Sequence, residues 1–131
     1  MMTWDDLMND DFIPYRRTII ENNYQMFKKK INSLVDNIMT NVINDKTKDL
    51  HLTINDYPYD VENDVNHYII WDLNEEQLEK KEQLDRYREF AESNFNLDIY
   101  DIIIKINKVQ YQSIPEIKHC HLFTRLKNKS L

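Results

Sequence analysis

Residues 117–125 read Ile-Lys-His-Cys-His-Leu-Phe-Thr-Arg, and this stretch decides the fold class that we expect for the chain. The side chains of a β-strand point alternately to its two faces, so His119, His121 and Arg125 share one face. The other face, which includes Cys120, is apolar and is typical of a strand whose sheet is covered by helices on that side. The face with the histidines would then be available to a cleft.

Three further segments, residues 50–54, 67–71 and 99–107, have the alternation or the β-branched and aromatic content of strands. Polar, turn-forming stretches such as residues 55–60 separate them. Together with a strand over residues 117–126, these segments predict one mainly antiparallel sheet.

Helical patterns occupy the rest of the chain. Thr3 followed by Asp6 predicts a short capped helix that ends before Pro14. Apolar residues at spacings of three and four over residues 14–42 predict one long amphipathic helix. Cap and first-turn signals predict a third helix over residues 74–94. The expected fold class is therefore α+β, with two N-terminal helices, a mainly antiparallel sheet and one helix between its strand pairs.

The length and charge of the chain limit its organisation and its partners. A chain of 131 residues has the usual size of one domain. We expect a single domain, residues 1–131, with a helical part over residues 1–45 and an α+β part over residues 50–126. A net charge of -6 disfavours an electrostatic grip on phosphate backbones, so duplex nucleic acid is not an expected partner.

The same composition indicates where the protein works. The longest apolar runs, such as Ile102 to Ile104, are too short to span a bilayer, and acidic residues stand where a signal peptide needs basic ones. We therefore expect no membrane association. A single cysteine, Cys120, cannot form an intramolecular disulfide, which fits a reducing compartment and predicts a cytoplasmic protein.

The sequence contains no glycine. This excludes phosphate-binding P-loops, dinucleotide-binding fingerprints and nucleophile elbows, because each needs glycine for positive φ or for close approach of the backbone to a ligand. We expect asparagine and aspartate to occupy left-handed turn positions instead. The richness in Asn, Ile and Lys also fits an AT-rich genome.

His119 and His121, with Arg125 four residues further on, suit three kinds of chemistry. A neutral imidazole held in one tautomer can attack phosphorus while the other groups stabilise phosphate charge. The two histidines with His67 could instead ligate zinc, or they could be an inert pair that holds the sheet together. No cysteine pair and no HExxH motif accompanies them, so we expect neither a dedicated metal site nor a cofactor.

An ordered set of motifs resembles the N-acetylglucosamine-induced protein family over nearly the whole chain. The set consists of residues 3–7, the long helix, residues 55–59, residues 67–71 and residues 113–125. That family typically reads NDWPYG, HLVVW and HxHVxVR at the last three places, and here Tyr57 replaces the Trp and Asp60 the Gly. It has no settled biochemical activity, so the resemblance implies an architecture more than a reaction.

Part of this set is also similar to the histidine triad hydrolases and transferases. Asn55-x-x-Pro58, a strand that begins at His67 and the later His119-Cys120-His121 occur in the order found in that family. The resemblance implies a nucleotide-binding α+β fold with His119 as the nucleophile and His121 beside it. Ile117 stands where the first histidine of the triad would be, and the glycines of the phosphate loop are absent.

These observations lead to one main hypothesis and one rival. The main hypothesis is a histidine-triad-like domain that binds a small phosphorylated ligand, a nucleotide or a sugar phosphate, in the manner of a degenerate phosphoester hydrolase. Whether it is an enzyme is left open. The rival is an interaction or structural protein, viral in origin, that retains the fold without the chemistry. The expected site contains His119 as the catalytic residue and His121, Arg125, His67, Asp56 and Tyr57 as ligand-binding residues.

Overall fold

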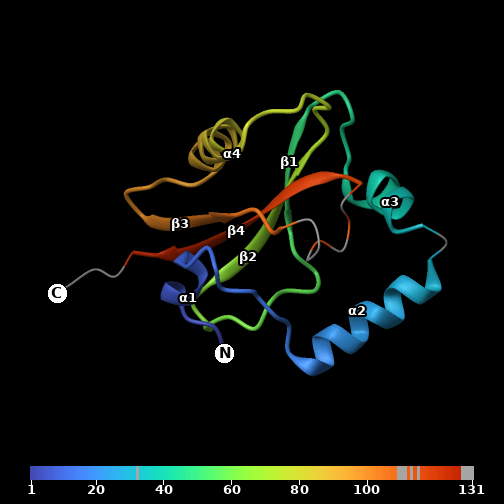
Figure 1. Cartoon of the computed structure of the whole chain (residues 1–131), viewed down its shortest axis with the longest axis horizontal. Coiled ribbons are helices and arrows are strands. Elements are labelled where there is room, and N and C mark those ends of the chain that lie inside the picture. The colour runs from blue at the N-terminus through green and yellow to red at the C-terminus, as the bar shows by residue number, and fades with distance from the viewer. Residues whose placement is uncertain (32, 109–111, 113, 115, 128–131) are drawn as a thin grey trace.

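A computed structural model describes residues 1–31, 33–108, 112, 114 and 116–127. Ser113 and Pro115, which belong to the motif set of the family resemblance, lie outside the described residues. Within the described ranges, the chain forms an antiparallel sheet with helices on both of its faces (Figure 1).

The sheet has four strands in the order β1-β2-β4-β3, and every neighbouring pair is antiparallel. The strands are β1 Leu50–Ile54, β2 Asn66–Asp72, β3 Tyr100–Lys105 and β4 Lys118–Leu126. The predicted α+β class and antiparallel sheet are confirmed, with strand ends shifted by one or two residues. Strands β2 and β4 lie at the centre, so the residues that they carry are the most enclosed in the sheet.

One face of the sheet packs against α4, which spans Lys80–Asn94. Ile70 of β2 and Cys120 of β4 are fully buried there, against Tyr87 and Ala91 of the helix. Burial raises the pKa of the Cys120 thiol well above its usual value. Cys120 is therefore a small core residue and not a reactive thiol.

The face that carries the histidines is covered at its two ends. At one end α1, Trp4–Met8, packs Trp4 and Leu7 against Phe123 of β4. At the other end Ile38 packs against Trp71 of β2. The middle of this face, between the two hydrophobic clusters, borders a cavity.

The predicted long helix over residues 14–42 is wrong in two respects, because it begins at Thr18 and is interrupted. It forms α2, Thr18–Lys30, and then α3, Leu34–Asn37, which continues as a π-helical turn over Ile38–Val42. Ser33 accepts a hydrogen bond from the backbone N–H of Asp36, and such a local cap competes with a continuous helix. Among the described residues, no helix is long and apolar enough to cross a membrane.

Helix α4 begins six residues later than the Asn74 start that the sequence predicts. The Asn74 side chain accepts the N–H of Glu76, and the Glu76 carbonyl accepts a hydrogen bond from Lys118 of β4. These contacts hold the segment in an extended connection, because the backbone groups that would start a helix are engaged elsewhere. The predicted end of the helix, at Asn94, is confirmed.

The chain turns without glycine, and its described part also turns without left-handed residues. No φ angle is positive there, so the expectation of left-handed Asn and Asp positions is wrong for these residues. Instead, Asn and Asp side chains accept the backbone N–H two residues on, which forms a turn at ordinary φ angles. Turns of this kind begin at Asn9, Asp45, Asn55, Asp72, Asn74 and Asn96.

Asp72, at the end of β2, fastens α4 to the sheet. Its carboxylate is buried and accepts hydrogen bonds from Arg86 and from the Tyr87 hydroxyl, the latter at 2.9 Å. Burial by itself favours the neutral acid. The hydrogen bonds from Arg86, the Asn74 backbone and Tyr87 outweigh burial and hold the pKa of Asp72 below its usual value.

We therefore expect Asp72→Asn to lower the free energy of unfolding by about 2 to 4 kcal/mol, because Arg86 would lose its buried charged partner and keep only the more distant, exposed carboxylate of Asp49. The matched control is Asp101→Asn, which breaks the half-exposed pair with Arg125 and should change stability by less than about 1 kcal/mol. Urea unfolding of both variants measures the difference. Equal losses in the two variants would contradict the anchoring role of Asp72.

Candidate functional site

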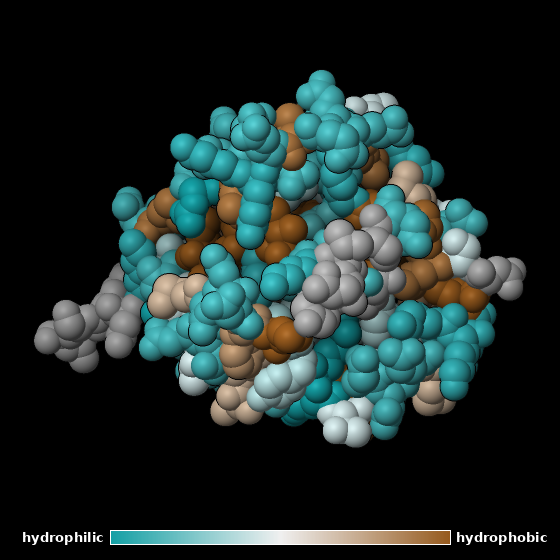
Figure 2. All heavy atoms as spheres, in the orientation of Figure 1, coloured by the Kyte–Doolittle hydropathy of each residue, from teal (hydrophilic) through white to brown (hydrophobic). Residues whose placement is uncertain are grey.

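A cavity of about 450 Å³ lies between the middle of the sheet and the helices α2 and α3. Its size is within the range of small-molecule sites, which are concave and mostly apolar with a few polar groups. In the space-filling view, hydrophilic side chains cover most of the visible face and apolar atoms show in recesses between them (Figure 2). The cavity is lined by Tyr24, Phe27, Leu34 and Ile38 from the helices, by Thr53, Ile69, Trp71, His119 and His121 from the sheet, and by Arg16, Glu21, Asp56, Tyr57 and Tyr59 near its polar end.

The register of the two central strands places the histidines on the cavity side. His119 lies opposite Trp71, and His121 lies opposite Ile69. The rings of His119 and His121 are 5.6 Å apart and nearly perpendicular. The alternation in the sequence therefore brought these two side chains to one face, as expected.

His119 is held in a defined tautomer by its own backbone. Its Nδ1 lies 2.8 Å from the carbonyl oxygen of Ile117, which can only accept, so Nδ1 carries the proton and Nε2 is an acceptor that no described residue engages. Burial lowers the pKa of His119, against the opposing effect of the bond to Ile117. A neutral imidazole with an unprotonated Nε2 at a cavity can accept a proton or act as a nucleophile.

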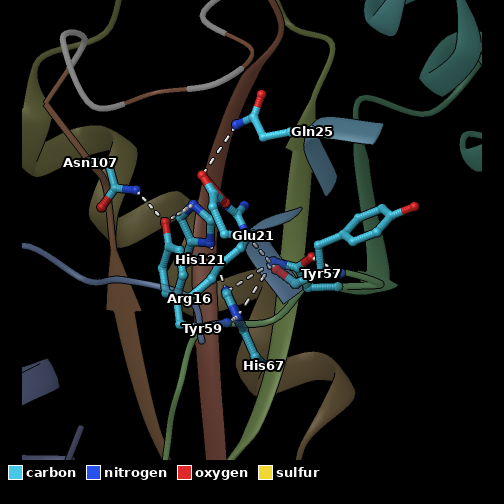
Figure 3. Close-up of polar contacts among 9 residues, drawn as sticks. Arg16, Glu21, Gln25, Tyr57, Tyr59, His67, Asn107 and His121 are labelled. Atoms are coloured by element: carbon cyan, nitrogen blue, oxygen red, sulfur yellow. Dashed lines mark hydrogen bonds and ion pairs between the residues drawn. The ribbon is translucent and has the colours of Figure 1, made fainter. Parts of the chain in front are cut away.

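His67 and His121 form a buried pair below the cavity (Figure 3). The backbone N–H of Tyr59 lies 3.2 Å from Nδ1 of His67, and Nε2 of His67 lies 2.7 Å from Nδ1 of His121. Burial lowers the pKa of His67 to about 3 and the pKa of His121 well below its usual value. Both rings are therefore neutral at physiological pH.

Tyr59 is the third member of this buried group of side chains. Its hydroxyl lies 3.3 Å from Nε2 of His121 and accepts a hydrogen bond of 2.8 Å from the side-chain amide of Asn107. Its ring stacks on that of His121 at 4.9 Å. Burial raises the pKa of the hydroxyl, so Tyr59 keeps its proton.

Arg16 supplies the positive charge at the cavity that the sequence led us to expect from Arg125. Its Nε donates to the Tyr57 carbonyl at 2.7 Å, and its Nη1 lies 3.3 Å from a Glu21 carboxylate oxygen (Figure 3). The guanidinium also lies 4.4 Å from the centre of the Tyr24 ring. Arg16 precedes α2, although the sequence predicted it to lie in the first turn of the long helix, and no motif in the sequence pointed to it as a site residue.

Of the other predicted site residues, Asp56 and Tyr57 line the cavity. His67 stands behind His121 and supports it, and is not itself part of the lining among the described residues. Arg125 lies elsewhere, 3.3 Å from Asp101 and with its guanidinium 4.4 Å from the Trp4 ring.

Arg125 illustrates why a shared face is not a shared site. At about 3.3 Å per residue, it is roughly 20 Å along β4 from His119. It lines a separate hollow near α1 and β3. We therefore leave Arg125 out of the candidate site.

The histidine pair has the spacing of a hydrogen bond and not of a metal centre. Two nitrogens bound to one tetrahedral zinc ion at about 2.0 Å lie roughly 3.3 Å apart, whereas the nearest nitrogens of His67 and His121 are 2.7 Å apart. In the described part of the chain, no group of three or more His, Cys, Asp or Glu side chains is placed to hold a metal ion.

Comparisons with known proteins give a family and a fold. The sequence model of a family described as "Protein of unknown function (DUF3605)" matches residues 3–125. A solved structure described as "Crystal Structure of HTC1" is similar, with a TM-score of 0.56 and 19% sequence identity over 86% of this chain and 76% of that chain. At this identity the likeness shows a shared fold alone. No curated protein matches the chain significantly. None of these results bears on the resemblances to the N-acetylglucosamine-induced family or to histidine triad proteins, and both stay predictions.

The buried histidines predict a loss of stability in mild acid. The unfolded chain binds protons at His67 and His121 near pH 6.5, while the folded chain does so only far lower, so their contribution is present above pH 6.5 and is lost below it. For the two groups together we expect the free energy of unfolding to fall by about 2 to 3 kcal/mol between pH 7.5 and 5.5. In His67→Gln the fall should be smaller by about 1.4 kcal/mol, the share of one histidine. Urea unfolding at several pH values measures it, and a pH-independent wild type would contradict the neutral pair.

Proposed function

The chain belongs to the DUF3605 family, and we propose that its cavity binds a small phosphorylated ligand, a nucleotide or a sugar phosphate. The observation that carries this proposal is the Nε2 atom of His119, which is held unprotonated at the cavity by the bond of Nδ1 to Ile117. A protonated phosphate oxygen or a hydroxyl of the ligand could donate a hydrogen bond to this atom, and the phosphate would also lie in a cavity that Arg16 lines.

Arg16 supplies the charge that an anionic ligand needs. A guanidinium can donate two parallel hydrogen bonds to phosphate oxygens, and its weak hydration suits a partly enclosed site. The side chain of Arg16 is 14% exposed, while that of its partner Glu21 is 42% exposed. An arriving phosphate would replace Glu21, because the more exposed carboxylate can turn outward into water at little cost.

The aromatic wall of the cavity suits the remainder of such a ligand. The Tyr57 ring lies 5.0 Å from that of Tyr24 and 5.6 Å from that of Phe27, so the rings form one continuous apolar surface. A nucleobase or the apolar face of a sugar ring would pack on this surface. Asp56, at the edge of the wall, offers a carboxylate to hydroxyl or amino groups of the ligand.

Hydrolysis is an extension of the binding proposal. The lone pair of Nε2 of His119 would form a bond to phosphorus as the bond from phosphorus to the leaving oxygen breaks, and the leaving oxygen would take a proton from water. The hydroxide left from that water would then attack phosphorus and cleave its bond to nitrogen, which releases phosphate and restores the neutral imidazole. The resemblance to histidine triad proteins is part of this proposal. Ile117 in place of a histidine does not weaken it, because residue 117 orients His119 through its backbone carbonyl.

The rival proposal, an interaction or structural protein of viral origin without chemistry, draws on the same site. His67 and His121 are almost fully buried and bonded to each other, as expected of side chains that serve packing. On this alternative His119 would also serve stability alone. The two proposals differ in whether the cavity is ever occupied by a phosphorylated molecule.

We expect at least one of inorganic phosphate, AMP and glucose 6-phosphate to raise the thermal unfolding midpoint, because a ligand at about 100 times its Kd adds about 2.7 kcal/mol of stability. His119→Asn and Arg16→Gln should each abolish the shift. The matched control is His51→Asn on β1, whose ring is bonded to the Lys48 carbonyl and does not line the cavity. This variant should respond as the wild type does.

The rival predicts a different pattern in the same experiment. None of the three compounds would raise the midpoint of the wild type. His119→Asn would lower the free energy of unfolding by about 1 to 3 kcal/mol, through partners left unsatisfied. That combination of results would overturn the binding proposal.

A further inference from the structure

We infer that the hydroxyl of Tyr59 donates a hydrogen bond to an oxyanion of the bound ligand, and that His67 and His121 are positioning residues that direct it there. This inference rests on the proposed function and adds a ligand-contacting residue to it. It follows from the direction of each hydrogen bond in the group shown in Figure 3.

The first bond sets the tautomer of both histidines. A backbone N–H can only donate, so Nδ1 of His67, 3.2 Å from the N–H of Tyr59, accepts. The proton of the neutral His67 ring is therefore on Nε2, which donates to Nδ1 of His121 at 2.7 Å. His121 then carries its own proton on Nε2, which points to the Tyr59 hydroxyl at 3.3 Å. The bonds form a ring that begins at the backbone of Tyr59 and ends at its side chain.

The second step concerns the hydroxyl oxygen of Tyr59. It accepts from Nε2 of His121 and from the amide nitrogen of Asn107 at 2.8 Å, and a tyrosine oxygen has room for about two such bonds. The Tyr59 hydroxyl can still donate its own proton in one hydrogen bond. Among the described residues, the two groups within hydrogen-bond distance of the hydroxyl are those of His121 and Asn107. Both donate to it, so its proton has no acceptor among these residues.

The third step is the position of this donor. Tyr59 lines the cavity together with His119 and Arg16. The Arg16 guanidinium lies 5.4 Å from the centre of the Tyr59 ring, so the donor and the positive charge are at the same end of the cavity. An oxyanion at this end would meet a neutral hydrogen-bond donor and a cation together, which is the usual composition of an oxyanion site.

The ring of Tyr59 has little freedom to turn the hydroxyl away. It stacks on His121 at 4.9 Å and contacts His67 at 4.7 Å. The residue is 8% exposed. Burial raises the pKa of the hydroxyl, which keeps the proton in place at neutral pH. The donor is thus fixed in position before the ligand arrives, and no ordering of the side chain has to accompany binding.

The first experiment tests the ring of hydrogen bonds without any ligand. Long-range ¹H–¹⁵N NMR spectra of the full chain at neutral pH distinguish the tautomers of histidine. We expect His67 and His121 to be protonated on Nε2, and His119 to be protonated on Nδ1. His121 protonated on Nδ1 would overturn the inference, whatever the protein binds, because the hydroxyl of Tyr59 would then have to donate to His121.

The second experiment tests the contact with ligand, using whichever of inorganic phosphate, AMP and glucose 6-phosphate binds the wild type. Tyr59→Phe keeps the stacked ring and removes the hydroxyl, so we expect binding by calorimetry to weaken about 5- to 10-fold. The matched control is Tyr68→Phe, which removes a hydroxyl on the opposite face of β2, where the ring contacts Phe95. Its affinity should equal that of the wild type.

The outcomes separate the inference from the proposed function. If none of the three compounds binds the wild type, the proposed function fails and the ligand contact of Tyr59 fails with it. If a compound binds and Tyr59→Phe retains wild-type affinity, only the role of Tyr59 is overturned. His67→Gln gives a second measure. Loss of this positioning residue should change the tautomer of His121, which the NMR spectra report, and should thereby weaken binding.

Discussion

The pairing of β2 with β4 is the interaction on which the rest of this structure depends. Its antiparallel register sets Ile69 opposite His121 and Trp71 opposite His119, and it turns Asp72 and Cys120 to the other face. A shift of the register by one residue would exchange the two faces, because side chains alternate along each strand. The cavity would then lose its histidines, and α4 would lose the carboxylate that fastens it to the sheet. One set of backbone hydrogen bonds therefore supports both the core and the candidate site.

The two faces of this central pair manage buried polarity in opposite ways. On the α4 face, a buried carboxylate stays charged because Arg86 and Tyr87 donate to it. On the cavity face, burial keeps His67 and His121 neutral, and the neutral rings satisfy each other because Nε2 of His67 donates a hydrogen bond to Nδ1 of His121. A neutral relay is the less costly arrangement beside a cavity, where a charge would have to be desolvated without a counterion. The charged group at the polar end of the cavity, Arg16, is paired with the carboxylate of Glu21.

The loop between β1 and β2 shows how a chain without glycine can still position a site. The Asn55 side chain accepts the N–H of Tyr57, and the Asn55 N–H donates to the His67 carbonyl. The loop is thereby bonded to the strand that follows it, and it presents the backbone N–H of Tyr59 to the His67 ring. Side-chain turns of this kind need no left-handed backbone, so the absence of glycine removes certain ligand-binding loops without removing tight turns. The aromatic residues of this loop also form part of the cavity wall.

Local patterns in the sequence determined the strands, the antiparallel sheet, the end of α4 and the shared face of His119 and His121. All of these follow from periodicities of two or of three to four residues, which neighbouring residues carry by themselves. Tertiary structure alone decided the arrival of Arg16 at the cavity and the position of Arg125 beside Asp101 and Trp4. It also decided the tautomers of His67 and His121. Each of these depends on contacts between residues far apart in the chain, such as the bond from the Tyr59 backbone to His67 or from Arg16 to the Tyr57 carbonyl. Periodicity assigns a side chain to a face, but only the folded chain decides where along that face it lies and which group it meets.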